Sequence, residues 1–166
     1  MYNIFYSALK DYNMKINLKQ IFDIVGEKKE FSYEIPPEEF SEIKGYSFDS
    51  PVNLSGKLHN RAGVVYLDYS AVFRLLHTCD RCLKEFSRDY DLSFDHIVVP
   101  SVSNEDNDDY VVADGESIDL NEIALTDMLL SLPTKILCKD DCKGLCLVCG
   151  CDLNEKQCDH LNNNEL

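Results

Sequence analysis

Eight cysteines constrain the fold of this chain more than any other feature of its sequence. Cys79 and Cys82 form a C-x2-C pair near the middle, and the other six lie between residues 138 and 158. The chain does not open on a basic segment followed by an apolar one, so we expect a cytoplasmic protein with reduced thiols. Thiols at C-x2-C spacing in that compartment favour metal binding over a disulfide framework.

The end of the chain predicts one compact zinc site. In "CLVCG" a tight turn can direct both thiolates to one ion, and Gly150 allows the positive φ that such a turn favours. "CDH" supplies a second pair, so that the spacing becomes C-x2-C-x8-C-x-H. Cys151 lies beyond the turn, and we expect it to remain a free thiol. The predicted ligands are Cys146, Cys149, Cys158 and His160.

The other four cysteines predict a second site, formed by Cys79, Cys82, Cys138 and Cys142. A metal ion held by two distant pairs would tie the middle of the chain to its tail and contribute to folding. The alternative is a single site in the tail, and disulfides or free thiols are a third possibility. We expect one or two zinc ions, with two preferred. The ligands of the single-site alternative are Cys142, Cys146, Cys149 and Cys158.

Two long stretches alternate apolar and polar residues, which is typical of strands with one buried face. They cover residues 64–77 and 86–98 and are joined by "TCDRCLKE". This order predicts an antiparallel hairpin with Cys79 and Cys82 at its tip. A shorter strand precedes it over residues 52–58, and "HNRAG" supplies the turn between them.

The segment "SIDLNEIALTDMLLSLP" predicts the main helix. Asp119 can cap its first turn, Glu122 follows three residues later, and Pro133 ends it. Its apolar stripe is expected to pack against the sheet, with a groove for a partner as the alternative. The acidic segment that starts at Ser101 has little to bury and is expected to form a mobile loop.

These elements predict an α+β fold: an antiparallel β-rich domain with one main helix and a C-terminal tail that resembles a zinc knuckle or zinc ribbon. We expect an N-terminal extension over residues 1–13 and the β-rich domain over residues 14–135. The cysteine-rich tail, residues 136–166, is expected to pack on that same domain.

The net charge of −14 disfavours a general clamp on nucleic acid and suits a basic protein partner, although charge also serves solubility. Residues 57–88 are the exception, with six basic side chains against three acidic ones. This stretch predicts contacts with RNA phosphates, and the alternative is a solvated surface without a partner. The predicted nucleic-acid-binding residues are Arg74, Arg81, Lys84 and Arg88.

No catalytic constellation is evident in the sequence. Thiolate-filled zinc sites are mostly closed, and neither H-E-x-x-H nor the H-x-E of zinc deaminases occurs. No apolar run is long enough to span a membrane, and no Gly-rich phosphate loop occurs, so we expect neither a membrane nor a small-molecule substrate. The alternatives to a non-catalytic binding protein are a zinc-dependent nucleic-acid-binding module and a nuclease that acts on rRNA precursors.

Three motifs together resemble the YceD family, the large ribosomal RNA subunit accumulation proteins. They are "CDRCLKEF" after a long alternating strand, "IDLNEIALTDMLLSLP", and "CKGLCLVCGCDLN" followed by "CDH". The resemblance starts at about Met14. Leu147 replaces the usual proline of the family tail, and His160 replaces the last cysteine of its C-x-C ending. Some family members lack the last cysteines but keep the pair that matches Cys79 and Cys82.

The resemblance implies a factor that supports accumulation of 23S rRNA and has no catalytic residues. The gene of this family commonly adjoins that of a small basic protein of the large ribosomal subunit. The implied partners are therefore a basic large-subunit ribosomal protein, 23S rRNA or its precursor, or both.

Overall fold

The computed structural model describes residues 14–41, 43–101 and 110–160. The chain forms two compact units. The sheet unit comprises residues 1–75 and 89–132, and the cysteine unit comprises residues 76–88 and 133–166. The hairpin tip is thus grouped with the tail rather than with the β-rich domain. The expected boundaries at residues 13 and 135, and the packing of the tail on the β-rich domain, stay predictions, and residues 1–13 lie outside the described part.

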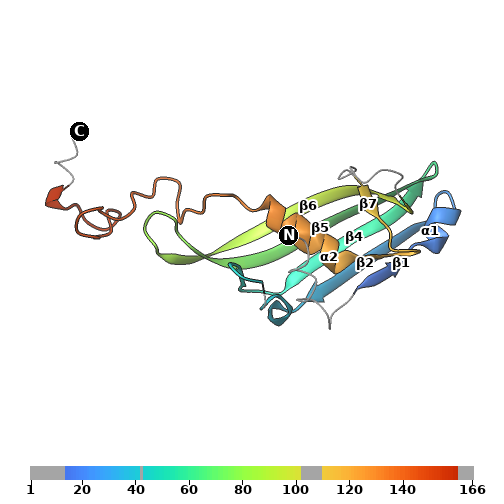
Figure 1. Cartoon of the computed structure of the whole chain (residues 1–166), viewed down its shortest axis with the longest axis horizontal. Helices are drawn as coiled ribbons and strands as arrows, with labels where there is room; N and C mark the ends of the chain where they lie inside the picture. Colours follow the sequence, from blue (N-terminus) through green and yellow to red (C-terminus); the bar gives the residue numbers. More distant parts are fainter. Residues whose placement is uncertain (1–13, 42, 102–109, 161–166) are drawn as a thin grey trace. The chain divides into compact units, whose positions relative to one another are not determined.

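The fold is α+β, as the sequence predicts, with a mixed sheet of six strands and one main helix. The path β2-β4-β5-β6-β7 is antiparallel from β2 through β5, and β7 runs parallel to β6 (Figure 1). The strands of this sheet are β2 (Lys28–Ile35), β3 (Ser47–Phe48), β4 (Val52–Arg61), β5 (Val64–Thr78), β6 (Glu85–Val99) and β7 (Tyr110–Val112). The remaining elements are β1 (Lys15–Asn17), α1 (Lys19–Asp23), the 3-10 helix η2 (Pro37–Phe40), β8 (Ser117–Asp119) and α2 (Leu120–Ser131).

The predicted hairpin and turns are confirmed. β5 and β6 are consecutive strands that leave Cys79 and Cys82 between them. Between β4 and β5, Ala62 and Gly63 both have positive φ, at 55° and 87°. This is the conformation of a two-residue type I′ turn, whose twist matches that of the flanking strands.

The core lies between the sheet and α2, which crosses one face of the sheet (Figure 1). Along β5 every second residue is buried, because the odd positions face the helix. Asp119 caps α2 as predicted, accepting hydrogen bonds from the backbone N–H groups of Asn121 and Glu122. Its apolar stripe packs in the core, which confirms the expected role, and no described helix is long and apolar enough to cross a membrane. The buried residues of α2 include Leu120, Ala124, Leu125 and Met128.

Gly56 of β4 allows the backbone of Tyr69 on β5 to approach it closely in the middle of the sheet. It faces Tyr69 across the β4–β5 pair, and a Cβ atom here would overlap the Asp68 carbonyl oxygen. The Tyr69 ring packs on Phe94 at a centroid distance of 5.1 Å. Burial and a hydrogen bond to Asp127 raise the pKa of Tyr69 far above its ordinary value, so the phenol stays protonated and donates to Asp127.

Asp127 also joins α2 to β6 through His96, whose Nε2 atom lies 2.6 Å from the Asp127 Oδ2 atom. The hydrogen bond to Asp127 raises the pKa of His96 above its ordinary value, although burial opposes this. The protonated ring is therefore the form that the fold stabilises.

This contact makes stability depend on pH in a defined direction. The stabilisation by His96 is fully present below the ordinary pKa of 6.5 and is lost as pH rises through the higher pKa of the folded state. We expect His96→Gln to lower the free energy of unfolding by about 1–3 kcal/mol near pH 6, and by clearly less near pH 9. Urea unfolding at both pH values measures the difference. An equal loss at both would contradict the proposed charge state.

Candidate metal centres

The two C-x2-C segments fold into the same local turn although their flanking sequences differ. In the hairpin the Cys79 N–H donates to the Lys84 carbonyl at 2.9 Å, and the Leu83 N–H donates to the Cys79 carbonyl at 3.0 Å. The tail repeats both bonds, from Cys146 to Cys151 at 2.9 Å and from Gly150 to Cys146 at 2.8 Å. Both segments are therefore knuckles that turn two thiols toward one point.

The residue after each second cysteine has positive φ, as the knuckle requires. In the tail this residue is Gly150, with φ of 71°, as the sequence predicts. In the hairpin it is Leu83, with φ of 59° and 63% of its surface exposed. A leucine in the left-handed region costs about 1–2 kcal/mol, so the surrounding contacts hold it there.

Leu83 therefore offers a stabilising substitution. Leu83→Gly removes the backbone strain of the positive φ angle, and it loses little buried surface because Leu83 is mostly exposed. We expect it to raise the free energy of unfolding by about 0.5–1 kcal/mol. Leu83→Val adds a β-branch in the same conformation and should lower it by about 1 kcal/mol. Denaturant unfolding of the metal-loaded protein checks the pair. Equal stability of the two variants would show that no strain is stored at this position.

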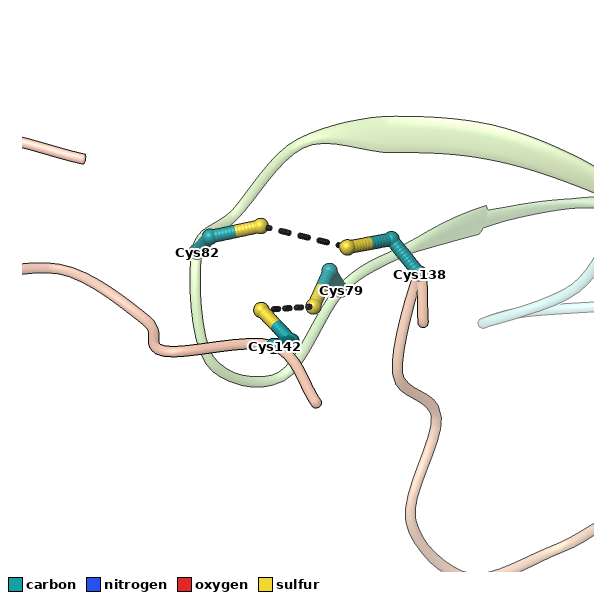
Figure 2. Close-up of side chains that lie close together, drawn as sticks. All are labelled: Cys79, Cys82, Cys138 and Cys142. Atoms are coloured by element: carbon teal, nitrogen blue, oxygen red, sulfur yellow. Dashed lines mark hydrogen bonds between the residues drawn. The ribbon is translucent and has the colours of Figure 1, made fainter. Parts of the chain in front are cut away.

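The first cysteine tetrad joins the hairpin knuckle to the tail. Cys79 and Cys82 come from the knuckle, and Cys138 and Cys142 come from the segment after α2 (Figure 2). The Sγ atoms of Cys79 and Cys142 lie 3.7 Å apart, and those of Cys82 and Cys138 lie 3.6 Å apart. All four Sγ atoms lie within 4.8 Å of one another, so the structure brings together the four residues predicted for this site.

Hydrogen bonds to the knuckle hold the tail in place around this tetrad. Asp80 donates its N–H to the Ile136 carbonyl at 2.8 Å and accepts the Ile136 N–H on Oδ2 at 2.6 Å. The Arg81 Nη1 atom donates to the Cys142 carbonyl, and the Arg88 Nη2 atom donates to the Leu137 carbonyl, both at 2.7 Å. Three charged side chains thus bond the backbone on either side of Cys138.

These bonds bear on the predicted nucleic-acid-binding residues. Arg81 and Arg88 are engaged inside the cysteine unit, and Arg74 forms an ion pair of 3.0 Å with Asp89 in the sheet unit. Lys84 is exposed in the cysteine unit. Arg74 thus lies in the sheet unit and the other three residues lie in the cysteine unit. The contact of these four residues with RNA stays a prediction.

The first tetrad favours a thiolate on Cys79. Burial raises the pKa of this thiol, but the backbone N–H groups of Cys82, Cys138 and Arg81 outweigh burial and lower it to about 6. Burial and the neighbouring thiols raise the pKa of Cys138 to about 12. At neutral pH Cys79 is therefore a thiolate, the form that binds metal, whereas Cys138 keeps its proton until a cation displaces it.

The second tetrad lies in the tail and differs from the predicted site at one position. It contains Cys146, Cys149 and Cys158, as expected, but its fourth member is Cys151. The Cys151 carbonyl accepts the Cys146 N–H, so the knuckle continues through this residue and keeps its thiol beside the others. The expectation of a free thiol assumed that the chain had already turned away.

His160 remains beside this tetrad rather than within it. A hydrogen bond between its ring and Cys149 helps to lower the pKa of that thiol to about 6, after the larger effect of the backbone and thiol of Cys151. The Nδ1 atom of His160 is buried and has no hydrogen-bond partner in the described part of the chain. Five candidate ligands therefore lie at this centre, and the role of His160 as a ligand stays a prediction.

Asn154 links the loop of the second tetrad to the first, a role that the sequence analysis did not identify. Its Nδ2 atom lies 3.5 Å from the Cys142 Sγ atom, and its Oδ1 atom accepts the Lys143 N–H at 2.9 Å. Its own N–H donates to Asp152 at 2.8 Å. A donor aimed at a cysteine sulfur stabilises the thiolate form, which is the form that binds metal.

Both tetrads have a donor set that fits a tetrahedral metal ion. Four cysteines that converge within a few ångströms are typical of structural zinc sites, which leave no position open for a substrate. Such centres hold loops in place rather than activate water.

The fold and the site define an α+β protein with a cysteine-rich unit, whose two tetrads have a geometry that could hold metal ions. Residues 67–165 match the sequence profile of one family, the large ribosomal RNA subunit accumulation protein YceD, and the chain belongs to the YceD family. The matched residues contain both tetrads and α2. No curated protein and no solved structure matches the chain.

Proposed function

We propose that this chain supports the accumulation of large-subunit ribosomal RNA as a non-catalytic binding factor in the cytoplasm. The observation that carries the proposal is the match of residues 67–165 to a family of large ribosomal RNA subunit accumulation proteins. Cysteine tetrads support a binding role, since four thiolates fill the coordination sphere of zinc.

Zinc is the proposed cofactor, with one ion in each tetrad. Each ion would contribute to the folding of the cysteine unit, whose loops are short and carry few apolar residues. Cys79, Cys82, Cys138 and Cys142 would hold the first ion, and Cys146, Cys149, Cys151 and Cys158 the second.

The distribution of charge supports a basic protein as the direct partner. The sheet unit has nine Lys and Arg against twenty-two Asp and Glu, a net charge of −13, whereas the cysteine unit has seven against eight, a net charge of −1. A basic large-subunit ribosomal protein would therefore bind the sheet unit, and the less acidic cysteine unit is the better place for a contact with rRNA.

The proposal is tested in cells that lack the chain. We expect them to contain less large-subunit rRNA relative to small-subunit rRNA, and expression of the chain should restore the ratio. A Cys82→Ser variant should restore it poorly, whereas Leu83→Gly should restore it fully. Cleavage of an rRNA precursor by the purified, metal-loaded chain, abolished by one substitution, would overturn the non-catalytic role.

A further inference from the structure

We propose that the open edge of β6, over residues 89–95, binds an extended basic segment of a partner protein as an added strand. The inference rests on the proposed function only for the basic character of the partner. Sheets bind peptides in this way when a strand edge is unpaired, because backbone hydrogen bonds supply affinity and alternate side chains supply specificity.

Within the described part of the chain, the outer edge of β6 is paired only near its end. β7 pairs with Ile97–Val99 alone, and the sheet order places β5 on the other side (Figure 1). Among the described residues, no strand pairs with residues 89–95 on the outer side. Unpaired N–H and C=O groups along a strand edge offer a template on which another chain can pair.

The outward backbone groups can be assigned along this segment. The Val99 carbonyl accepts the Ala113 N–H beyond the end of β7, so the carbonyl of this odd-numbered residue points away from β5. N–H and C=O groups alternate in direction from residue to residue, and burial alternates without interruption over residues 85–96. The outward N–H and C=O groups, which have no strand partner among the described residues, therefore belong to the odd-numbered residues from Asp89 to Asp95.

The same residues carry the charge. Asp89, Asp91 and Asp95 are exposed at alternate positions, and Ser93 lies between the last two. Asp89 pairs with Arg74, whereas Asp91 and Asp95 have no ion pair with any described residue. The whole segment from residue 89 to residue 132 has twelve acidic residues and no Lys or Arg, so it cannot neutralise them from within.

The acidic residues along this edge favour a basic segment over a second copy of the chain as the added strand. A second copy added antiparallel would place one acidic row beside another, which is destabilising across a strand pair. A segment with Lys or Arg at alternate positions would place each cationic residue opposite one of these edge residues, with the paired Cβ atoms about 5 Å apart. On the same face of the sheet, Ser93 and Asp95 help to line an open hollow of about 790 Å³ that extends across β5 and β4 to β2.

The test uses the full, metal-loaded chain and a labelled eleven-residue peptide with arginine at alternate positions and threonine between. Fluorescence anisotropy at physiological salt should show binding. In an antiparallel added strand, the arginine amides face the edge and the threonine amides face away. We expect N-methylation of the arginine amides to weaken binding at least about ten-fold, and N-methylation of the threonine amides to change it less than about three-fold.

Charge variants of the protein provide the second arm. Asp91→Lys/Asp95→Lys should weaken binding at least about ten-fold, whereas Asp23→Lys/Glu38→Lys, with the same change in net charge at other exposed sites, should change it little. Equal losses from both double variants, or from both methylated peptides, would overturn the inference, and so would no binding. These outcomes leave the proposed function intact, because the rRNA ratio in cells tests that separately.

Discussion

Cys79→Ser is expected to reduce the bound zinc from two ions per chain to one. Cys79 is fully buried, its sulfur lies 3.7 Å from that of Cys142, and backbone N–H groups lower its pKa to about 6. A buried hydroxyl cannot replace this thiolate, so the first ion is lost together with several kcal/mol of folding free energy of the cysteine unit. Native mass spectrometry counts the ions, and NMR spectra separate the loss of the cysteine unit from the sheet unit.

Two further variants identify the ligands of the second centre. If Cys151 is the fourth ligand, Cys151→Ser removes the second ion and His160→Ala retains it; the reverse result would assign that position to His160. Neither variant should affect the first ion. Retention of two ions by Cys79→Ser would contradict the first centre.

Gly56→Ala is expected to be the most damaging single-atom change in the sheet unit. The added Cβ atom would lie 2.5 Å from the Tyr69 Cβ atom and overlap the Asp68 carbonyl oxygen, and both are parts of a central strand that cannot move freely. We expect a loss of about 2–4 kcal/mol in the free energy of unfolding, because the shift also displaces the Tyr69 hydroxyl from Asp127. Thermal and denaturant unfolding measure it.

Ser55→Ala is the matched control for this prediction. Ser55 adjoins Gly56 on β4 but lies on the open face, where its hydroxyl contacts Ser70 at 3.1 Å. We expect a change below about 0.5 kcal/mol. If both variants unfold at the same denaturant concentration, the close approach of β4 and β5 is not needed for stability.

The elements of the sheet unit could be predicted where a local rule fixes the structure. The alternation in residues 64–98 predicts two strands because one face must be buried, and Asp119 predicts the start of α2 because its carboxylate satisfies free N–H groups. The first tetrad could be predicted because Cys79, Cys82, Cys138 and Cys142 are the two cysteine pairs left after the tail site is assigned. In each case the signal lies within a few residues or in residue type alone.

Other features depend on geometry that the sequence does not display. The membership of Cys151 in the second tetrad depends on how far the knuckle continues, and the conformation of Leu83 has no glycine to mark it. The hydrogen bonds from Arg81 and Arg88 to backbone carbonyls of the tail have no sequence signal either, and the contact of these residues with RNA stays a prediction. The parallel pairing of β7 with β6 also has no local signal, because it joins segments that meet only in the folded chain.

The cysteines of the first tetrad lie far apart in the sequence, which has a consequence for the synthesis of the chain. Cys82 and Cys138 lie 56 residues apart, and all of α2 is made between them. On the ribosome that makes this chain, the hairpin cysteines must therefore wait, without their partners, until the tail leaves the exit tunnel. Closure of the first centre would then follow the synthesis of Cys142, and until that point the thiols of Cys79 and Cys82 would have no partners from the tail.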